Sequence, residues 1–237
     1  MIGSVIKGLL RLASLRYGAR GAGLNRLAGL FFVIFAAFGA PTLAAPVTVL
    51  ALGDSLTQGY GLPPEDGLVP QLGRWLAAHG TEAELINAGV SGDTTAGGRA
   101  RVEWSLTPEV GAVIVALGGN DLLRGLAPEE ARANLDAILT TVGARGLPVL
   151  LVGLKAPGNY GAAYQADFDA IWPDLAAKHG ALLLPDLLAP IAALPPETRA
   201  AEGLMQGDNI HPSAKGVAMV VEALGPKVQE LVAKAAP

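Results

Sequence analysis

The sequence predicts a three-layer α/β/α sandwich around a five-stranded parallel sheet, for three reasons. From residue 47 onward, short aliphatic or β-branched runs alternate with longer segments of helical period. The short runs are apolar on both faces, as strands are when helices cover both sides of a parallel sheet. Polar residues gather directly after these runs, at the strand ends where such sheets bind ligands. This organisation belongs to the α/β class.

The elements follow one another in a regular order. The strands are expected over Val47–Gly53, Glu84–Gly89, Ala112–Gly118, Pro148–Leu154 and Ala181–Leu187, with sequences VTVLALG, ELINAG, AVIVALG, PVLLVGL and ALLLPDL. The helices are expected over Leu68–His79, Thr94–Leu106, Pro128–Arg145, Tyr164–His179 and Ser213–Ala235, where apolar residues recur with helical spacing. No repeat or linker interrupts this alternation, so residues 46–237 are expected to form a single domain.

Residues 1–45 have the pattern of a secretory signal peptide. The only charged side chains before residue 54 are the five bases Lys7, Arg11, Arg16, Arg20 and Arg26. An apolar stretch, Leu27–Ala40, and small residues ending at Ala44 and Ala45 follow, so cleavage is expected after one of these two alanines. The alternative is a retained membrane anchor, but Pro41 interrupts the apolar run before the roughly 20 residues that span a bilayer. We therefore expect a periplasmic or secreted protein without a stable membrane anchor.

Composition excludes several classes of function. The 237-residue chain has no cysteine, which removes thiol nucleophiles, disulfides, lipoprotein anchors and cysteine-ligated metal sites. Residues 54–237 hold 12 of the 17 bases and all 21 acids, a net charge of −9. Nucleic acid is not an expected partner, because binding its phosphates requires a basic face.

Four polar loops are expected to meet at one edge of the sheet. Parallel strands place their carboxyl ends together, and each of these loops follows a strand or precedes the last helix. Their sequences are Gly53-Asp54-Ser55-Leu56-Thr57-Gln58-Gly59, Asn87-Ala88-Gly89-Val90-Ser91-Gly92-Asp93-Thr94-Thr95, Gly118-Gly119-Asn120-Asp121 and Gly207-Asp208-Asn209-Ile210-His211-Pro212.

The three histidines differ in their surroundings. Without cysteine, acyl transfer would need a serine or threonine activated by a base, normally histidine. His79 and His179 each end an expected helix just before a glycine, a typical structural position. His211 lies in a loop three residues after Asp208, whose carboxylate could fold back onto Nδ1 and leave Nε2 facing the cleft. His211 is therefore the candidate general base.

Ser55 is the candidate nucleophile, with a structural alternative. It directly follows an expected strand, and Gly53 permits the sharp turn that would expose its hydroxyl. Alternatively, Asp54 or Ser55 only caps the following helix. The surrounding sequence is not the G-x-S-x-G elbow of the α/β-hydrolases, because residue 57 is threonine.

Four blocks in order resemble those of the SGNH, or GDSL-type, hydrolases. The blocks are Gly53-Asp54-Ser55-Leu56, Gly92, Gly118-Gly119-Asn120-Asp121 and Asp208-Asn209-Ile210-His211-Pro212. The extended strings Leu52–Gly61, Ser91–Thr95, Gly118–Gly125 and Pro157–Gly161 resemble the branch of periplasmic arylesterases, acyl-CoA thioesterases I and lysophospholipases L1. This resemblance implies a flavodoxin-like topology and activity without a cofactor or metal.

The resemblance also implies a role for each matching residue. Ser55 would be the nucleophile, His211 the base and then the acid, and Asp208 the group that orients His211. The oxyanion hole would comprise the backbone N–H groups of Ser55 and Gly92 and the side-chain amide of Asn120.

The same residues have structural alternatives. Asn120 could be an ordinary turn residue and Gly92 could only shape its loop, whereas Asp54 and Asp121 are expected to bind loop backbone. Asn159 and Tyr160, after the fourth strand, could form a wall of the acyl pocket or a simple turn. The segment Pro195–Gly207, with Leu204 and Met205, could also line an acyl site.

Together these features predict an exported, monomeric serine esterase acting on small acyl esters, and also on thioesters or lysophospholipids. Three alternatives are a carbohydrate O-deacetylase of the same family, a metal-dependent phosphoesterase and a non-catalytic exported binding module. The ligands of the phosphoesterase would be Asp54, Asn120, Asp121, Asp208 and His211.

Overall fold

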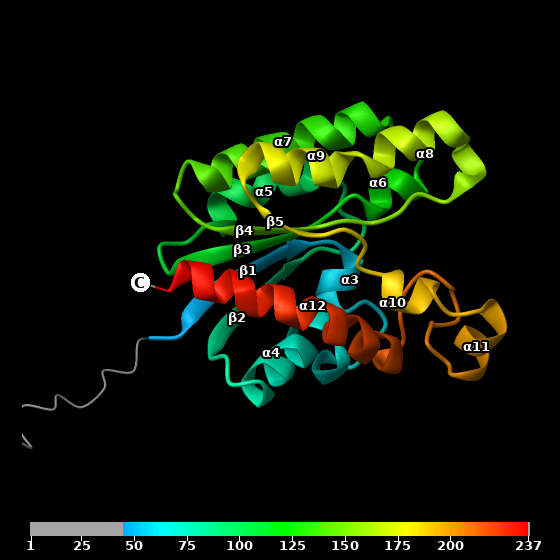
Figure 1. Cartoon of the computed structure of the whole chain (residues 1–237), viewed down its shortest axis with the longest axis horizontal. Coiled ribbons are helices and arrows are strands. Elements are labelled where there is room, and N and C mark those ends of the chain that lie inside the picture. The colour runs from blue at the N-terminus through cyan, green and yellow to red at the C-terminus, as the bar shows by residue number, and fades with distance from the viewer. Residues whose placement is uncertain (1–44, 237) are drawn as a thin grey trace, which may run out of the picture. The chain divides into compact units, whose positions relative to one another are not determined.

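The computed structural model describes residues 45–236 of the chain (Figure 1). Apart from Ala45, the expected signal peptide over residues 1–45 lies outside the described residues. Among the described residues, no helix is both long and apolar enough to cross a membrane.

The predicted five-stranded parallel sheet is confirmed. Its strands are β1 (Val47–Gly53), β2 (Ala83–Gly89), β3 (Val110–Ala116), β4 (Val149–Val152) and β5 (Leu182–Leu184). All neighbours pair in parallel in the order β2-β1-β3-β4-β5, the flavodoxin-like order. Strand β5 ends earlier than expected, because Pro185 follows it and cannot donate a ladder hydrogen bond.

Helices cover both faces of this sheet (Figure 1). The helices α4 (Leu68–Ala78), α10 (Ala189–Ala192) and α12 (Ala214–Ala235) pack against one face. The other face carries α5 (Thr95–Ser105), α7 (Pro128–Gly143), α8 (Ala162–Asp169) and α9 (Ile171–His179). The predicted three-layer α/β/α sandwich is therefore confirmed, with one apolar core on each side of the sheet.

One expected helix is divided in two. The segment Tyr164–His179 was expected to form a single helix, whereas α8 ends at Asp169 and α9 begins at Ile171. Pro173 explains the break, because it has no N–H to donate to the carbonyl of Asp169.

Short helices also occur where only loops were expected. They are α3 (Ser55–Gln58), α6 (Gly119–Leu123), α11 (Pro196–Ala201) and the 3₁₀ turns Pro64–Asp66 and Gly158–Tyr160.

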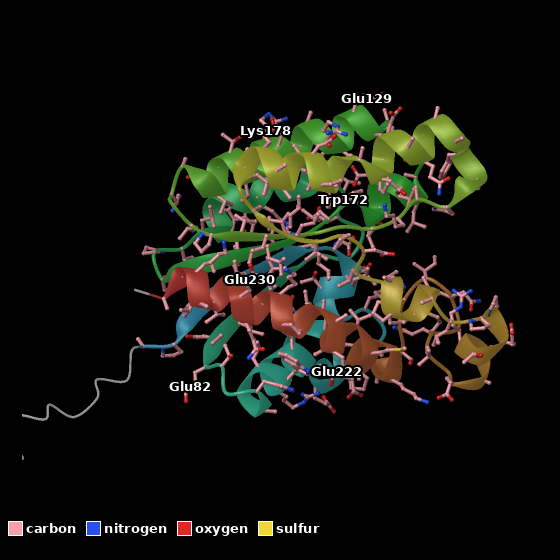
Figure 2. The ribbon with its side chains drawn as sticks, viewed as in Figure 1. Glu82, Glu129, Trp172, Lys178, Glu222 and Glu230 are labelled. Atoms are coloured by element: carbon pink, nitrogen blue, oxygen red, sulfur yellow. The ribbon has the colours of Figure 1, made fainter. Side chains whose placement is uncertain are left out.

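Charged and apolar side chains separate as this layering requires. Trp172 of α9 lies between the helices and the sheet and is only 1% exposed. Glu129, Lys178 and Glu222 project from the outer faces of their helices into solvent (Figure 2). The interior thus offers few polar groups, and the polar residues that are buried concentrate at the carboxyl edge of the sheet.

Three strands end level with one another at that edge. Gly53, the last residue of β1, lies opposite Gly89 of β2 and Ala116 of β3. The chain leaves β1 toward the face of α4 and leaves β3 toward the face of α7. The connections therefore part between β1 and β3, at the switch point where sheets of this type form a crevice.

Candidate active site

The turn after β1 places Ser55 at the first position of α3. Asp54 caps this helix, and its Oδ1 accepts a hydrogen bond of 3.0 Å from the N–H of Leu56. The turn is tight, because a Cβ atom on Gly53 would lie only 1.9 Å from Oγ1 of Thr57. As the first residue of a helix, Ser55 has an N–H without an intrahelical acceptor, so this N–H is available to a ligand.

Ser55, His211 and Asp208 form a continuous chain of hydrogen bonds. Oγ of Ser55 lies 2.9 Å from Nε2 of His211, although the two residues are 156 positions apart. Nδ1 of His211 lies 2.6 Å from Oδ2 of Asp208. Since an ionised carboxylate only accepts hydrogen bonds, Nδ1 donates to Asp208 and Nε2 is free to accept the Ser55 proton.

The carboxylate of Asp208 is held ionised by its own loop. Its Oδ1 accepts hydrogen bonds from the backbone N–H groups of Ile210 (2.9 Å) and His211 (3.0 Å). The backbone N–H of His211, its imidazole and the N–H of Ile210, in that order of effect, lower the pKa of Asp208 to about 2. Asp208 therefore stays charged and can stabilise a positive charge on His211.

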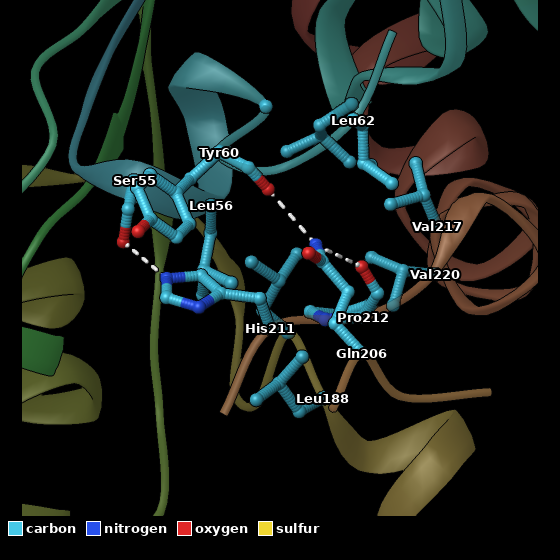
Figure 3. Close-up of a pocket in the computed structure, with 13 residues that line it drawn as sticks. Ser55, Leu56, Tyr60, Leu62, Leu188, Gln206, His211, Pro212, Val217 and Val220 are labelled. Atoms are coloured by element: carbon cyan, nitrogen blue, oxygen red, sulfur yellow. Dashed lines mark hydrogen bonds between the residues drawn. The ribbon is translucent and has the colours of Figure 1, made fainter. Parts of the chain in front are cut away.

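The loop that carries this pair is closed by backbone and side-chain contacts. Asn209 has a φ of 54°, in the left-handed region that asparagine tolerates, and this turns the next two N–H groups back toward Asp208. Gln206 donates through Nε2 to the carbonyls of Tyr60 (2.8 Å) and Pro212 (3.0 Å), as Figure 3 shows. Gln206 thereby ties the His211 loop to the Ser55 loop. This role of Gln206 was not predicted from the sequence, because both of its hydrogen-bond acceptors are backbone carbonyls.

The other two expected oxyanion donors lie at the ends of β2 and β3. Gly92 has a φ of 82°, which favours glycine, and within the described chain its N–H donates to no protein group. Asn120 lies on α6, and its Nδ2 donates to the carbonyl of Asp93 at 2.9 Å. This bond uses one of the two N–H groups of the Asn120 amide and fixes the orientation of the amide. The second N–H remains free to donate to a ligand.

The acidic residues expected to be structural bind loop groups. Asp121 is 1% exposed and accepts from the N–H (2.8 Å) and Oγ1 (2.6 Å) of Thr95. Asp54 is 3% exposed, and burial raises its pKa from 3.8 to about 6, against the opposing effects of the Leu56 N–H and of His211. Asp54 thus caps α3 as expected but carries a carboxyl whose charge is disfavoured beside Ser55.

The two remaining histidines lie away from Ser55. His79 follows the last turn of α4, stacks on the ring of Trp75 and binds its carbonyl through Nδ1 at 2.8 Å. His179 ends α9 and contacts Asp136 through Nε2 at 2.6 Å. Gly180 follows with a φ of 62°, the expected left-handed cap. Both positions fit the structural interpretation.

Two cavities open beside Ser55 and His211. The larger has a volume of about 130 Å³ and is mostly apolar; its lining includes Leu122, Leu123, Leu154, Leu188 and Ile210. The smaller, of about 20 Å³ (Figure 3), lies on the other side of His211 and is lined by Leu56, Leu62, Leu188, Val217 and Val220 among others. We refer to the larger one below as the leucine cavity.

The residues expected to form an acyl pocket are placed differently from these linings. Asn159 and Tyr160 form a 3₁₀ turn and line neither cavity, although the hydroxyl of Tyr160 approaches the carbonyl of Leu123 at 3.5 Å. Leu204 is 3% exposed and belongs to the core, and Met205 lines a separate surface hollow beside Arg199. Sequence reasoning missed the leucine cavity because its walls come from five separate segments of the chain.

Arg101 of α5 is the other residue near the site that sequence reasoning missed. Its side chain is buried and donates to the carbonyls of Gly53 and Ala88 and to the carboxylate of Asp93. A buried arginine in a helix is unusual and could have been noted, but its partners are not visible in the sequence.

The residues named for a metal site do not form one. Asp121 binds Thr95 and Asp208 binds His211, so their oxygens serve other partners. Across residues 45–236, no group of three or more histidine, aspartate and glutamate side chains is arranged to hold a metal ion.

Comparison with known proteins decides the family. The sequence profile of the GDSL-like lipase/acylhydrolase family matches residues 51–219, which include all four polar loops. The chain belongs to this family. The predicted resemblance to GDSL-type hydrolases is therefore confirmed.

Three members of the GDSL-like family illustrate the similarity. Esterase TesA of Pseudomonas aeruginosa is 36% identical over 190 residues, which cover 80% of this chain and 91% of TesA. The thioesterase 1/protease 1/lysophospholipase L1 of Escherichia coli K12 is 34% identical over 191 residues, or 80% and 86% of the two chains. The crystal structure of AlinE4, an SGNH-hydrolase family esterase, superposes with a TM-score of 0.65 at 45% identity and covers 83% of this chain and all of AlinE4. These names agree with the predicted class of enzyme, a carboxylic ester hydrolase.

The raised pKa of Asp54 predicts a pH-dependent stability. Because its folded-state pKa of about 6 exceeds the ordinary 3.8, its stabilising contribution is complete below pH 4 and is lost as the pH rises through 6. The side-chain amide of the variant Asp54→Asn does not titrate, so the variant does not lose stability in this way. Its amide oxygen can still accept the Leu56 N–H and cap α3. Between pH 4 and pH 7.5, we expect the free energy of unfolding of the wild type to fall relative to the variant by roughly 2 kcal/mol.

Urea denaturation at pH 4, 5.5 and 7.5 measures this difference. The exposed Asp167→Asn serves as the control and should track the wild type at every pH. Parallel curves for wild type and Asp54→Asn would show that the Asp54 carboxyl is not disfavoured by burial.

Proposed function

We propose that the protein is a serine esterase that hydrolyses acyl esters and thioesters through an acyl-enzyme on Ser55. The observation that carries this proposal is the chain of hydrogen bonds from Ser55 through His211 to Asp208, beside an apolar cavity. A hydroxyl linked to an imidazole, itself oriented by a carboxylate, is the arrangement that activates serine for attack on a carbonyl.

The geometry supports a two-step reaction. Nε2 of His211 takes the proton as Oγ of Ser55 attacks the carbonyl carbon, and Asp208 stabilises the resulting imidazolium. His211 then gives this proton to the leaving alcohol or thiol, and the C–O or C–S bond breaks. Water repeats the sequence on the acyl-enzyme and releases the carboxylic acid together with free Ser55.

The oxyanion formed in each step would receive three hydrogen bonds. The N–H of Ser55 lies at the start of α3, the N–H of Gly92 lies in the loop after β2, and Nδ2 of Asn120 comes from α6. Donors fixed before the reaction stabilise the developing charge without having to reorganise. No cofactor or metal is required by this chemistry.

The leucine cavity is the proposed site of the acyl chain. It begins at Ser55 and Asn120 and continues along leucine side chains, so an acyl group could enter it with its carbonyl at Ser55. The name of the Escherichia coli relative, which includes thioesterase and lysophospholipase, supports thioesters and lysophospholipids as substrates. We therefore propose acyl esters, acyl thioesters and lysophospholipids as the substrate class.

The basic and apolar pattern of residues 1–45 supports export to the periplasm or the medium. We expect the active enzyme in the periplasmic fraction of a Gram-negative host to begin just after Ala44 or Ala45. N-terminal sequencing of that fraction measures this. Recovery of the intact chain in the cytoplasm would contradict export.

Replacement of the proposed nucleophile is the first test of the activity. Ser55→Ala removes the attacking oxygen, so kcat for p-nitrophenyl butyrate should fall by about 10⁶-fold, as for other serine hydrolase nucleophiles. Thr140→Ala is the control, since the exposed Thr140 hydroxyl binds the carbonyl of Asp136 within α7. Retention of most activity in Ser55→Ala would exclude the acyl-enzyme mechanism.

Filling the leucine cavity tests the acyl site. In Leu154→Trp the larger ring would occupy the cavity, so kcat/KM should fall at least tenfold for p-nitrophenyl octanoate and by less than threefold for the acetate. A series of acyl chains from acetyl to palmitoyl, on esters and on thioesters, measures the change. Equal losses for acetate and octanoate would place the acyl chain elsewhere.

A further inference from the structure

We propose that Arg101 is a positioning residue that fixes the three oxyanion donors relative to one another. The inference rests on the proposed function, because it concerns the donors of that same site. Its starting point is a guanidinium buried at the carboxyl edge of the sheet, where the three donor-bearing loops begin.

The contacts of Arg101 are short and involve three separate segments. Nη2 donates to the carbonyl of Gly53 at the end of β1, and Nη1 donates to the carbonyl of Ala88 near the end of β2, both at 2.7 Å. Nε forms an ion pair of 2.7 Å with Oδ2 of Asp93 in the following loop. The side chains of Arg101 and Asp93 are only 10% and 15% exposed, so water competes little with these bonds.

Two of these contacts, at Gly53 and Asp93, lie next to the oxyanion donors in the sequence or in space. Gly53 is two residues before Ser55, whose N–H is the first donor. Asp93 directly follows Gly92, whose N–H is the second. The carbonyl of Asp93 accepts the Nδ2 hydrogen bond that orients Asn120, the third donor. One side chain of α5 thus links the backbone around all three donors.

A guanidinium is suited to this task in a way that lysine is not. Its five N–H groups lie in one plane, so it can hold two carbonyls and a carboxylate at the same time in fixed directions. An ammonium group could replace the charge but not this geometry. The negative charge of Asp93 offsets the cost of burying the positive charge of Arg101.

Arg101 acts on the donors and leaves the nucleophile and base untouched. None of its recorded hydrogen bonds reaches Ser55 Oγ, His211 or Asp208. His211 is positioned by the separate contacts of Asp208 and of the loop that Gln206 closes. Loss of Arg101 should therefore weaken stabilisation of the transition state without altering the titration of the catalytic base.

The test compares Arg101→Met and Arg101→Lys with the wild type on p-nitrophenyl butyrate, at a temperature well below each Tm. We expect kcat to fall by about 10²-fold, comparable to the loss of one oxyanion donor, and KM to change by less than threefold. The inflection of the kcat/KM profile against pH should stay in place. The Ki of butylboronic acid, which forms a tetrahedral adduct on serine, should rise in proportion to the loss in kcat/KM.

Asp93→Asn keeps the test decisive if Arg101→Met does not fold. It removes the charge that Nε contacts while leaving the carbonyl that orients Asn120, so we expect a loss of about tenfold in kcat with KM unchanged. The same parallel rise in the boronate Ki is expected.

Two variants control for loss of stability alone. Arg145 also binds a backbone carbonyl, of Leu106, and a carboxylate, of Glu103, but lies away from Ser55, so Arg145→Met should keep the wild-type kcat. Leu139→Ala opens a cavity in the core beside α7 and should lower Tm without changing kcat below that temperature.

The outcomes separate the inference from the function on which it rests. Wild-type kcat in Arg101→Lys and Asp93→Asn, with Ser55→Ala inactive, would overturn the positioning role and leave the esterase mechanism intact. A lowered Tm with unchanged kcat and boronate Ki would show a purely structural role and would also overturn it. Full activity of Ser55→Ala would contradict the proposed function itself.

Discussion

The parallel direction of the five strands is the constraint on which the site depends. It brings every strand-to-helix loop to one edge of the sheet, and the register aligns the ends of β1, β2 and β3 at Gly53, Gly89 and Ala116. Three short loops can then present Ser55, Gly92 and Asn120 within a small space. The loop before α12 completes the group, because α12 packs beside β1, β3, β4 and β5 and the His211 side chain of this loop reaches Ser55.

The apolar layers of the sandwich and the polar edge of the sheet have different roles: the layers stabilise the fold, and the edge carries the candidate site. Aliphatic strands buried between two helical layers supply most of the apolar surface removed from water. Most of the buried polar side chains lie near the carboxyl ends, where Asp121 and Arg101 satisfy backbone N–H and carbonyl groups of the loops. Asp54 also accepts a backbone N–H, that of Leu56, but burial raises its pKa, so keeping its charged form beside Ser55 lowers stability.

The sequence predicted the architecture well because its signals are local. Doubly apolar runs identify buried parallel strands, and glycine after a histidine identifies a helix end, without knowledge of distant contacts. The absence of cysteine left a hydroxyl as the candidate nucleophile, and the setting of His211 distinguished it from the other two histidines as the candidate base. Ser55 was singled out by its position after the first strand and by the resemblance to the GDSL-type blocks. Pro173 is also a local signal, because proline inside a helical pattern predicts a break between α8 and α9.

What escaped prediction depends on contacts between distant parts of the chain. Arg101 and Gln206 donate to backbone carbonyls up to 146 residues away. Every residue has a backbone carbonyl, so the residue types do not reveal which carbonyl accepts the hydrogen bond. The leucine cavity likewise arises from Leu122, Leu154 and Ile210, which come together only in the folded chain. Asn159 and Tyr160 illustrate the reverse case, since their position after the fourth strand suggested a pocket wall, whereas they line neither of the two cavities beside Ser55.

In the proposed mechanism, Ser55 is a hydroxyl nucleophile activated by His211. Treatment with a fluorophosphonate, followed by intact mass spectrometry and peptide mapping, tests it most directly, because such reagents modify serines that an adjacent base activates. We predict one adduct per chain, located on the peptide that contains Ser55, and its absence after replacement of His211 by asparagine. An unmodified wild-type chain, or an adduct on a different residue, would exclude activation of Ser55 by His211.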